Sequence, residues 1–174
     1  VPDYMKRNYH FQTDGYLSSE SAEKYDHQVE ILFSGTAQAM RRMLIKDVKD
    51  HPRFQKNKPL KILEIGAGIG SATRDFAKSF NIDEYYVSDI STPYLKTAQK
   101  QLGEDEKLHF VTCDGADLPF KNETFDIVFS VFLFHEVPFE VREKIMEETR
   151  RVLKPKGLAA VCDSLQMDDN EHLN

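Results

Sequence analysis

Residues 63–70 read Leu-Glu-Ile-Gly-Ala-Gly-Ile-Gly. The apolar run that ends at Ile65 predicts a buried β-strand, and the glycines ahead of an amphipathic stretch predict a tight turn from strand to helix. Such a turn lets the backbone contact a ligand, because no side chain fills the space. A turn that needs glycine for its dihedral angles alone is the alternative. The stretch therefore predicts an α/β unit with a candidate ligand site at the end of its strand.

Short apolar runs and amphipathic stretches continue to alternate after Pro59. Predicted strands cover residues 60–65, 85–88, 108–112, 125–132 and 158–162, and predicted helices cover about 70–80, about 93–102 and a stretch that begins at Pro138. Strands separated by helices form right-handed parallel crossovers. We therefore expect an α/β fold, with a doubly wound, Rossmann-like, mostly parallel sheet and helices on both faces.

The first 58 residues follow a different pattern. Residues 1–18 are rich in Tyr, Asn, Asp and Ser and show no sustained period, which predicts an irregular arm. Its aromatic residues are Tyr4, Tyr9, Phe11 and Tyr16. From about Ser19 to Lys49 apolar residues recur at steps of three or four, which predicts helices divided at the Ser34-Gly35-Thr36 stretch. The predicted organisation is an N-terminal arm and helical cap over 1–58 and a core over 59–174.

Composition excludes several classes of protein. The 174 residues suit one domain, and the net charge of −6 gives no basic field that would attract nucleic acid. No apolar run approaches the roughly 20 residues needed to span a bilayer, and the N-terminal stretch lacks the apolar segment of a secretory signal. We therefore expect a cytoplasmic protein with a small-molecule substrate, no nucleic-acid partner and no membrane association.

The two cysteines, Cys113 and Cys162, both lie in apolar segments. Their spacing matches no zinc site, and free cysteine is among the residues most often buried. The sequence therefore predicts buried, reduced thiols and no metal site.

A carboxylate follows the second predicted strand. Asp89 lies 23 residues after Gly66, near the spacing of about 20 at which a nucleotide-binding sheet places an acid on the ribose. Asp89, Ser91 and Thr92 also suit the N-cap of the next helix, which is the alternative. The spacing favours the ribose role.

Five motifs in order resemble those of class I S-adenosylmethionine-dependent methyltransferases, closest to the small-molecule group that includes quinone-biosynthesis enzymes. These motifs are Glu64–Gly70, Asp89–Ser91, Asp114–Phe120, Phe125–Val128 and Leu153–Gly157. The resemblance covers roughly residues 60–162. It implies methyl transfer from S-adenosylmethionine to an unidentified, small-molecule acceptor, with S-adenosylhomocysteine as the product.

The resemblance also implies roles for residues of the glycine loop. Gly66, Gly68 and Gly70, with Ala67, would line the methionine part of the cofactor. Glu64 would hold the loop and meet the amino group of the cofactor, directly or through water. These roles follow from the family and not from the spacing alone.

Further roles carry over to the ends of the next strands. Asp89 would bind the ribose and Ile90 would pack on the adenine face. Asp114 would accept a hydrogen bond from the adenine amino group, while the Gly115 N–H would meet a ring nitrogen. The resemblance further implies that the backbone of Ser130 and Val131 borders the methyl donor.

His135 and Glu136 follow the fourth predicted strand, on the rim where a substrate should lie. A methyl sulfonium needs little covalent help, so we expect the protein mainly to position the reactants and exclude water. An imidazole with an ordinary pKa near 6.5 suits a general base, and our hypothesis assigns that role to His135. A histidine that only hydrogen-bonds a neighbouring loop, or caps the helix at Pro138, is the alternative.

The N-terminal arm and first helices resemble the variable cap of these enzymes, which closes over the substrate. Tyr16 and Tyr25 are candidates to stack on an acceptor as part of such a lid. Aromatic residues more often simply pack, and that alternative is favoured.

The chain departs from the family pattern after the fifth strand. The family sheet usually has seven strands, but after Cys162 this sequence continues only to Asn174 through a polar stretch. We therefore expect a C-terminally truncated core that lacks the last two strands. Because a bare apolar edge strand invites association, a homodimer through the fifth strand is the other expectation.

Two other functions compete with methyl transfer. A nicotinamide-dependent oxidoreductase expects G-x-G-x-x-G, but Ser71 stands at the last glycine position and Asp114–Phe120 has no role there. A catalytically inactive cofactor-binding or scaffold protein on the same fold would keep the carboxylates and glycines. The acceptor, and the choice between O-, N- and C-methylation, are left open by the sequence.

Overall fold

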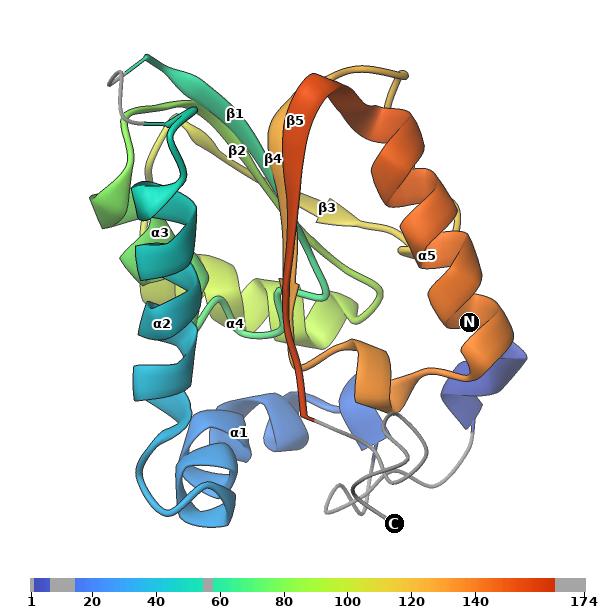
Figure 1. Cartoon of the computed structure of the whole chain (residues 1–174). Coiled ribbons are helices and arrows are strands. Elements are labelled where there is room, and N and C mark those ends of the chain that lie inside the picture. Colours follow the sequence, from blue (N-terminus) through green and yellow to red (C-terminus); the bar gives the residue numbers. More distant parts are fainter. Residues whose placement is uncertain (1, 7–14, 55–57, 165–174) are drawn as a thin grey trace, which may run out of the picture.

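A computed structural model describes residues 2–6, 15–54 and 58–164 of the chain (Figure 1). Five strands form one parallel sheet in the order β3-β2-β1-β4-β5, which confirms the expected fold class. The strands are β1 Leu60–Ile65, β2 Ile82–Asp89, β3 Leu108–Thr112, β4 Phe125–Val131 and β5 Leu153–Cys162. Successive strands run outward from β1 to β3, and the chain then returns to the other side of β1 for β4. The strand order therefore reverses at the carboxyl end of β1, which is where the glycine loop begins.

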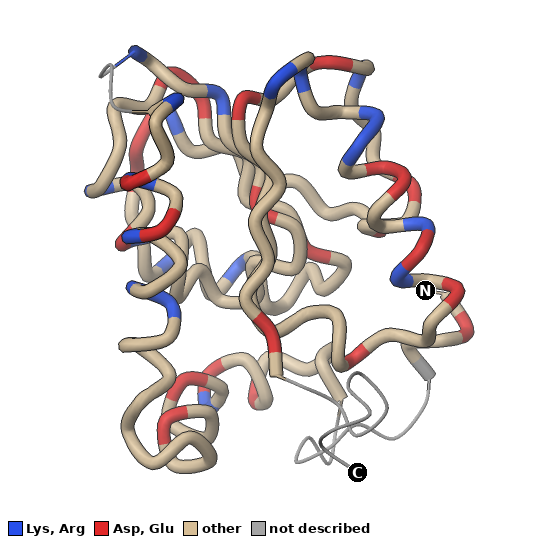
Figure 2. The backbone as a smooth tube through the Cα atoms, in the orientation of Figure 1, with Lys and Arg blue, Asp and Glu red and all other residues tan. Residues whose placement is uncertain are grey.

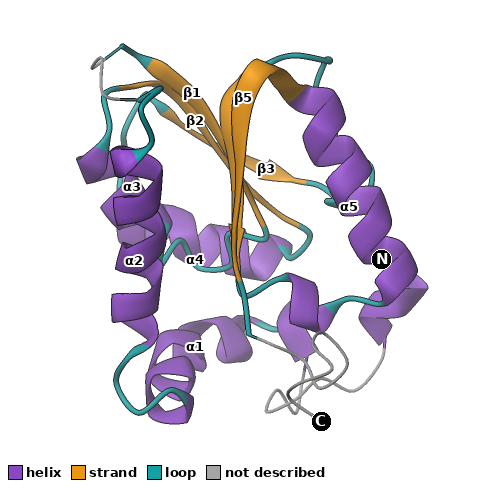
Figure 3. Cartoon of the chain, in the orientation of Figure 1, coloured by secondary structure: helices purple, strands orange, loops and turns teal. Residues whose placement is uncertain are grey.

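Helices cover both faces of the sheet (Figure 3). The α-helices are α1 Ser19–Leu32, α2 Ala37–Asp50, α3 Thr73–Ser79, α4 Thr92–Leu102 and α5 Phe139–Val152. Three 3-10 turns complete the elements, namely η1 Asp3–Lys6, η2 Gly15–Leu17 and η3 Phe134–Glu136. Helices α2, α3 and α4 share one apolar cluster with the sheet, and α5 shares the other. No helix in the described ranges has the length and apolar character needed to cross a bilayer.

The central strands are apolar on both sides, as expected of a covered parallel sheet. Alternate residues point to opposite faces, so Ile62 of β1 packs beneath α2 and α3 while Leu63 packs beneath α5. In the same way Phe129 of β4 joins the first cluster and Val128 joins the second. The rings of Phe76 and Phe129 stack with centroids 3.8 Å apart, which fixes α3 against β4.

The predicted break between the first two helices is confirmed. Ser34 and Gly35 adopt φ values of 51° and 80°, in the left-handed region that ends α1. Thr36 precedes α2, but its hydroxyl donates to the Phe33 carbonyl instead of capping the helix. Helix α2 then packs on the core through Leu44, so it is more than a loose cap. The division of the chain at residue 58 stays a prediction.

Three predicted boundaries differ from the structure by three residues or more. Strand β2 begins at Ile82, three residues before its predicted start. The polar pair Asp83 and Glu84 interrupts the apolar pattern, so the first residues of the strand were not recognised. Strand β5 begins at Leu153, directly after α5, five residues before its predicted start at residue 158. Helix α3 starts only at Thr73, since the glycines before it have positive φ values and cannot join a right-handed helix.

Acidic and basic residues alternate along α5 and are spread over the other helices (Figure 2). No stripe of a single sign is visible along the outer face of α5 in this view. Of the residues named in the sequence patterns, Tyr9, Phe11 and the stretch after residue 164 lie outside the described ranges.

Candidate functional site

The glycine loop follows β1 and turns sharply. Gly66, Gly68 and Gly70 have φ values of 70°, 59° and 79°, all in the left-handed region. A Cβ on Gly66 would lie 3.0 Å from the Leu133 side chain, and one on Gly70 would lie 2.8 Å from Leu102. Gly68 has more room, so only its φ demands glycine. Gly66 and Gly68 face a cavity, whereas Gly70 packs against α4.

Glu64 and Ala67 hold this loop from beneath. Glu64 is 2% exposed, and its Oε2 accepts hydrogen bonds of 2.7 Å from the hydroxyls of Thr73 and Tyr85. Burial raises the pKa of Glu64 to about 7, although these two hydrogen bonds oppose the shift. The N–H of Ala67 donates to the Ser88 carbonyl at 2.9 Å. Neither Glu64 nor Ala67 lines either cavity, and contact of Glu64 with the amino group of a cofactor, directly or through water, stays a prediction.

Asp89 ends β2 and joins two segments. Its Oδ2 accepts a 2.8 Å hydrogen bond from the Gly68 N–H, and its Oδ1 accepts one of 2.7 Å from the Ser91 N–H. The N-cap of α4 is Ser91, whose hydroxyl accepts from the Tyr94 N–H. Burial raises the pKa of Asp89, and the backbone donors oppose that shift. Because each carboxylate oxygen has two lone pairs, Asp89 can still accept from a ligand in the cavity it faces.

The end of β3 carries a second carboxylate. Asp114 accepts hydrogen bonds at Oδ1 from the Ala116 N–H, at 2.9 Å, and from the Tyr4 hydroxyl, at 2.7 Å. A Cβ on Gly115 would lie 2.8 Å from the Ile65 side chain, so this position admits no larger residue without displacement. Tyr4 was not identified as a site residue from the sequence.

Two cavities lie beyond the carboxyl ends of β1 and β2, where the strand order reverses. The first, of about 80 Å³, is lined by Tyr16, Tyr25, Gly68 and Glu136, and we call it the Tyr16 cavity. The second, of about 50 Å³, is lined by Tyr4, Cys113 and Gly115, and we call it the Gly115 cavity. The residues that line both are Met5, Gly66, Asp89, Ile90, Leu133 and Val137.

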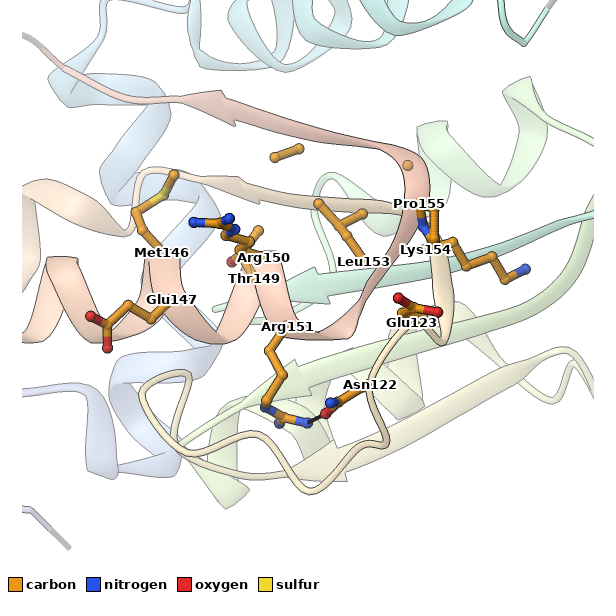
Figure 4. Close-up of a pocket in the computed structure, with 12 residues that line it drawn as sticks. Asn122, Glu123, Met146, Glu147, Thr149, Arg150, Arg151, Leu153, Lys154 and Pro155 are labelled. Atoms are coloured by element: carbon orange, nitrogen blue, oxygen red, sulfur yellow. Dashed lines mark hydrogen bonds between the residues drawn. The ribbon is translucent and has the colours of Figure 1, made fainter.

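A larger groove, of about 780 Å³, lies at the opposite end of the strands (Figure 4). It is bordered by the last turns of α5 and the start of β5, and its rim carries Arg151, which donates to the Asn122 side chain at 3.1 Å. Ligands of such sheets bind at the carboxyl ends of the strands. Size alone therefore does not identify the functional site.

Four polar side chains meet at the rim of the Tyr16 cavity. The Tyr16 hydroxyl donates to Glu136 Oε1 at 2.7 Å, and His135 Nε2 lies 3.4 Å from the same oxygen. On its other side, His135 Nδ1 lies 2.6 Å from Asp163 Oδ1. The second oxygen of Asp163 accepts from the Phe134 N–H at 2.6 Å. We call Tyr16, Glu136, His135 and Asp163 the rim network.

The rim network bears on the predicted role of His135. Burial alone would lower the pKa of His135, but hydrogen bonds to Asp163 and Glu136 raise it to about 9. An imidazole that holds its proton at neutral pH is a poor base. The residues that line the Tyr16 cavity also include Glu136 and not His135. The geometry therefore favours Glu136 over His135 as the group that faces a substrate.

Tyr16 and Tyr25 come together as the lid hypothesis requires, but they also pack. Their rings and that of Tyr94 form edge-to-face pairs with centroids 5.6 to 6.3 Å apart. These rings surround Ala22 and Ile69, and the Ser91 hydroxyl donates to the Tyr16 carbonyl. Burial raises the pKa of both Tyr16 and Tyr25, which keeps their phenols protonated. The two tyrosines thus both line the cavity and anchor the cap to the core.

Ser130 and Val131 do not line either cavity. Both are still within β4, and the Ser130 hydroxyl is buried with no hydrogen-bond partner among the described residues. Phe132, with a φ of 56°, turns the chain out of the strand, and it and Leu133 face the Tyr16 cavity instead. A contact of the Ser130 and Val131 backbone with the methyl donor stays a prediction.

Residues 63–161, more than half of the chain, match the methyltransferase domain family. The chain belongs to this family. Its resemblance to S-adenosylmethionine-dependent methyltransferases is thereby confirmed, and the match assigns the glycine loop to methyltransferases and not to nicotinamide-dependent oxidoreductases.

Relatives of this chain are named for different compounds. It is 30% identical over 149 residues to the demethylmenaquinone methyltransferase of Thermotoga maritima, covering 86% of this chain and 60% of the relative. It is 29% identical over 168 residues to the norajmaline N-methyltransferase of Rauvolfia serpentina, covering 86% and 56%. The chain spans about half the length of the curated relatives that it matches.

Solved structures agree with the fold. Phosphoethanolamine N-methyltransferase 1 of Haemonchus contortus, in complex with phosphoethanolamine and S-adenosylhomocysteine, superposes with a TM-score of 0.66 at 18% identity. The alignment covers 83% of this chain and 30% of that one. At this identity the likeness supports the fold alone.

Three residues of the site, Tyr4, Met5 and Asp163, were not identified from the sequence. Tyr4 and Met5 lie in an arm with no periodicity, so only the folded chain brings them to the cleft. Asp163 directly follows β5, just as Asp89 ends β2, so a carboxylate at a strand end was a usable signal. In the described part of the chain, no group of three or more His, Cys, Asp or Glu is arranged to hold a metal ion.

Proposed function

We propose that this chain binds S-adenosylmethionine beyond the carboxyl ends of β1, β2 and β3 and transfers its methyl group to a small molecule. One observation carries the proposal. Asp89, tied to the Gly68 N–H, faces a cavity where the glycine loop brings its backbone to the point at which the strand order reverses. A carboxylate can accept from the ribose hydroxyls, and the exposed backbone beside it can contact the methionine part of the same ligand.

The residues present fit an adenosyl ligand. Gly66 and Gly68 would hold the methionine part, because both line the Tyr16 cavity and Gly68 has room beside it. Asp89 would bind the ribose hydroxyls, since it lines both cavities. Gly115 lines the Gly115 cavity, where a larger side chain would not fit, and suits a flat ring. The neighbouring Asp114 would accept from the amino group of that ring.

The cofactor supplies an electrophilic methyl group. The chain itself must orient the acceptor, keep water away and hold or receive a proton. Ile90, Leu133 and Val137 supply an apolar wall to both cavities, which serves to exclude water. Glu64 and Ala67 act on the ligand only through the loop that they support.

On the acceptor side we propose that the Glu136 carboxylate is the base that receives the proton of the acceptor. His135, held by Asp163, acts as a positioning residue that keeps the Glu136 carboxylate directed at the cavity. This replaces the hypothesis that His135 is the base. If it is correct, Glu136→Gln lowers methyl transfer far more than His135→Gln does. An equal loss, or a larger loss for His135→Gln, would return the role of base to the imidazole.

The acceptor remains to be identified by experiment. Incubation with S-adenosylmethionine labelled in its methyl group and a pool of cellular metabolites should give a labelled small molecule. A protein that binds the cofactor but labels no metabolite under any condition would instead be the catalytically inactive binding or scaffold protein. A location in the cytoplasm stays a prediction from the sequence.

A further inference from the structure

The turn η1 lies against the cleft that the proposed function assigns to the cofactor. The Tyr4 hydroxyl donates to Asp114 Oδ1 at 2.7 Å, across 110 residues of sequence. Tyr4 packs against the apolar cluster beneath α5, and Met5 is 9% exposed. The Met5 N–H donates to the Pro2 carbonyl at 3.1 Å, which closes the turn. The segment is therefore seated on the core by a polar and an apolar contact together.

This segment takes up space in the cleft. Tyr4 and Met5 line the Gly115 cavity, and Met5 also lines the Tyr16 cavity. Around them the two cavities leave about 50 and 80 Å³. Pockets for small-molecule ligands hold roughly 300 Å³ or more. An adenosyl ligand therefore enters only after the segment has moved.

Resting on the proposed function, we infer that Tyr4 is an internal competitor of the cofactor. Tyr4 and Met5 take up the space beside Asp114 that the adenine would enter, and the Tyr4 phenol holds Asp114 Oδ1, so docking of η1 and binding of the adenosyl ligand exclude each other. Tyr4 then sets the affinity for the cofactor from outside the family's motif positions.

The exchange replaces one kind of donor by another. A phenol presents one O–H and an aromatic amine two N–H groups, in both cases at the rim of a flat ring. The other hydrogen bond to Asp114 Oδ1, from the Ala116 N–H, belongs to the local turn and stays in both states. Only the partner that reaches Asp114 from across the cleft changes.

The consequence for affinity follows from population arithmetic. When the binding-competent open state is a fraction of the molecules, the apparent dissociation constant rises by the inverse of that fraction. A hydrogen bond to a charged group favours the closed state enough to weaken binding by about tenfold. Removing the Tyr4 hydroxyl should therefore tighten binding of the cofactor by about that factor.

Calorimetric titration with S-adenosylhomocysteine on the full chain tests this inference. Tyr4→Phe, which keeps the ring, should bind about tenfold more tightly than the wild type, and Tyr4→Ala at least as tightly. Tyr86→Phe is the matched control, because Tyr86 also donates to a carboxylate, Glu84 Oε1, but lines neither cavity. Its affinity should equal that of the wild type.

Cys113 offers a second readout that needs no catalysis. This thiol lines the Gly115 cavity beside Tyr4, and burial raises its pKa to about 11. Alkylation of Cys113, followed by mass spectrometry with Cys162 as the internal reference, should be faster in Tyr4→Ala. Added S-adenosylhomocysteine should protect the thiol in that variant.

Three outcomes overturn the inference, and they differ from one another. Equal affinity of wild type and Tyr4→Phe means that the hydroxyl does not compete. Weaker binding by Tyr4→Phe means that Tyr4 belongs to the bound state, as a lid would. No heat with S-adenosylhomocysteine in the well-folded wild type and in both Tyr4 variants would overturn the proposed function itself.

Discussion

Glu64 makes the stability of the folded chain depend on pH in a way that can be calculated. The carboxyl is 2% exposed, and its pKa is about 7 in the folded protein, against an ordinary value of 4.5. The folded state therefore keeps a proton that the unfolded state releases. The contribution of Glu64 to the free energy of unfolding is fully present below pH 4.5. It is lost as the pH rises to about 7, because the folded state binds more protons than the unfolded state over this range.

The magnitude follows from the two pKa values. At 1.36 kcal/mol for each pKa unit, the full loss is about 3 kcal/mol, of which about 2.5 kcal/mol falls between pH 5 and pH 8. Glu64→Gln removes the titration but leaves an amide oxygen that can accept from Thr73 and Tyr85. The variant should therefore gain stability relative to the wild type as the pH rises.

Urea denaturation at pH 5 and pH 8 measures this difference. The free energy of unfolding of Glu64→Gln minus that of the wild type should increase by about 2.5 kcal/mol between the two pH values. Glu147→Gln, an exposed position on α5, serves as the control for the loss of a carboxylate from the surface, and the increase for Glu64→Gln should exceed the increase for this variant.

A difference that stays constant, or that shrinks toward pH 8, would refute this reasoning. It would mean that Glu64 is already ionised in the folded protein at pH 5, and that its two hydrogen bonds outweigh its burial.

Three further predictions follow from the site. By NMR titration, His135 should show a pKa near 9 in the wild type and a lower pKa in Asp163→Asn. Because the pKa in the folded protein lies above the ordinary 6.5, the contribution of His135 to stability should be lost as the pH rises from about 6.5 to 9. An unchanged pKa in Asp163→Asn would contradict the contact with Asp163. Gly70→Ala should lose about 2 to 4 kcal/mol of stability, because the residue has a positive φ and its new Cβ would lie 2.8 Å from the Leu102 side chain. Gly68→Ala has the positive φ alone and should lose roughly 1 kcal/mol. Equal losses in urea denaturation would contradict the packing of the loop. If the β5 edges of two chains pair, light scattering should report a dimer. Val161→Lys, at a residue 46% exposed on β5, should convert this dimer to a monomer. A monomeric wild type would contradict the pairing.

Sequence patterns predicted the parts of the fold that depend on local periodicity. Apolar runs mark β1 and β3 to the residue, and the left-handed turn at Ser34 and Gly35 divides α1 from α2 as expected. The pattern failed where charged residues continue a strand. Lys154 lies in β5 and still forms an ion pair, with Asp126 Oδ2 at 2.8 Å, so its position in the sheet has no apolar signature.

Site residues that lie directly at the carboxyl end of a strand were predictable. Gly66, Gly68 and Asp89 meet at one cavity, because parallel strands bring their carboxyl ends to the same edge of the sheet. Contacts between distant segments were not predictable. Tyr4 reaches Asp114 only through the path of the N-terminal arm, and no local pattern encodes that path.

The role of His135 shows a second limit. A histidine after a strand reads as a base when its ordinary pKa is assumed. Its environment includes Asp163, which lies 28 residues away in sequence and, together with Glu136, raises the pKa of the imidazole. The charge of a side chain depends on tertiary neighbours that a spacing argument does not include.

Calorimetric titration of the wild type and of Asp89→Ala with S-adenosylmethionine is the most direct test of the central claim. The wild type should bind at a single site per chain, and the variant should bind roughly 100-fold more weakly, because it loses the acceptor for the ribose and the tie to Gly68. No heat and no thermal shift in the well-folded wild type, or equal affinity of the two proteins, would contradict the claim that this cleft binds the methyl donor.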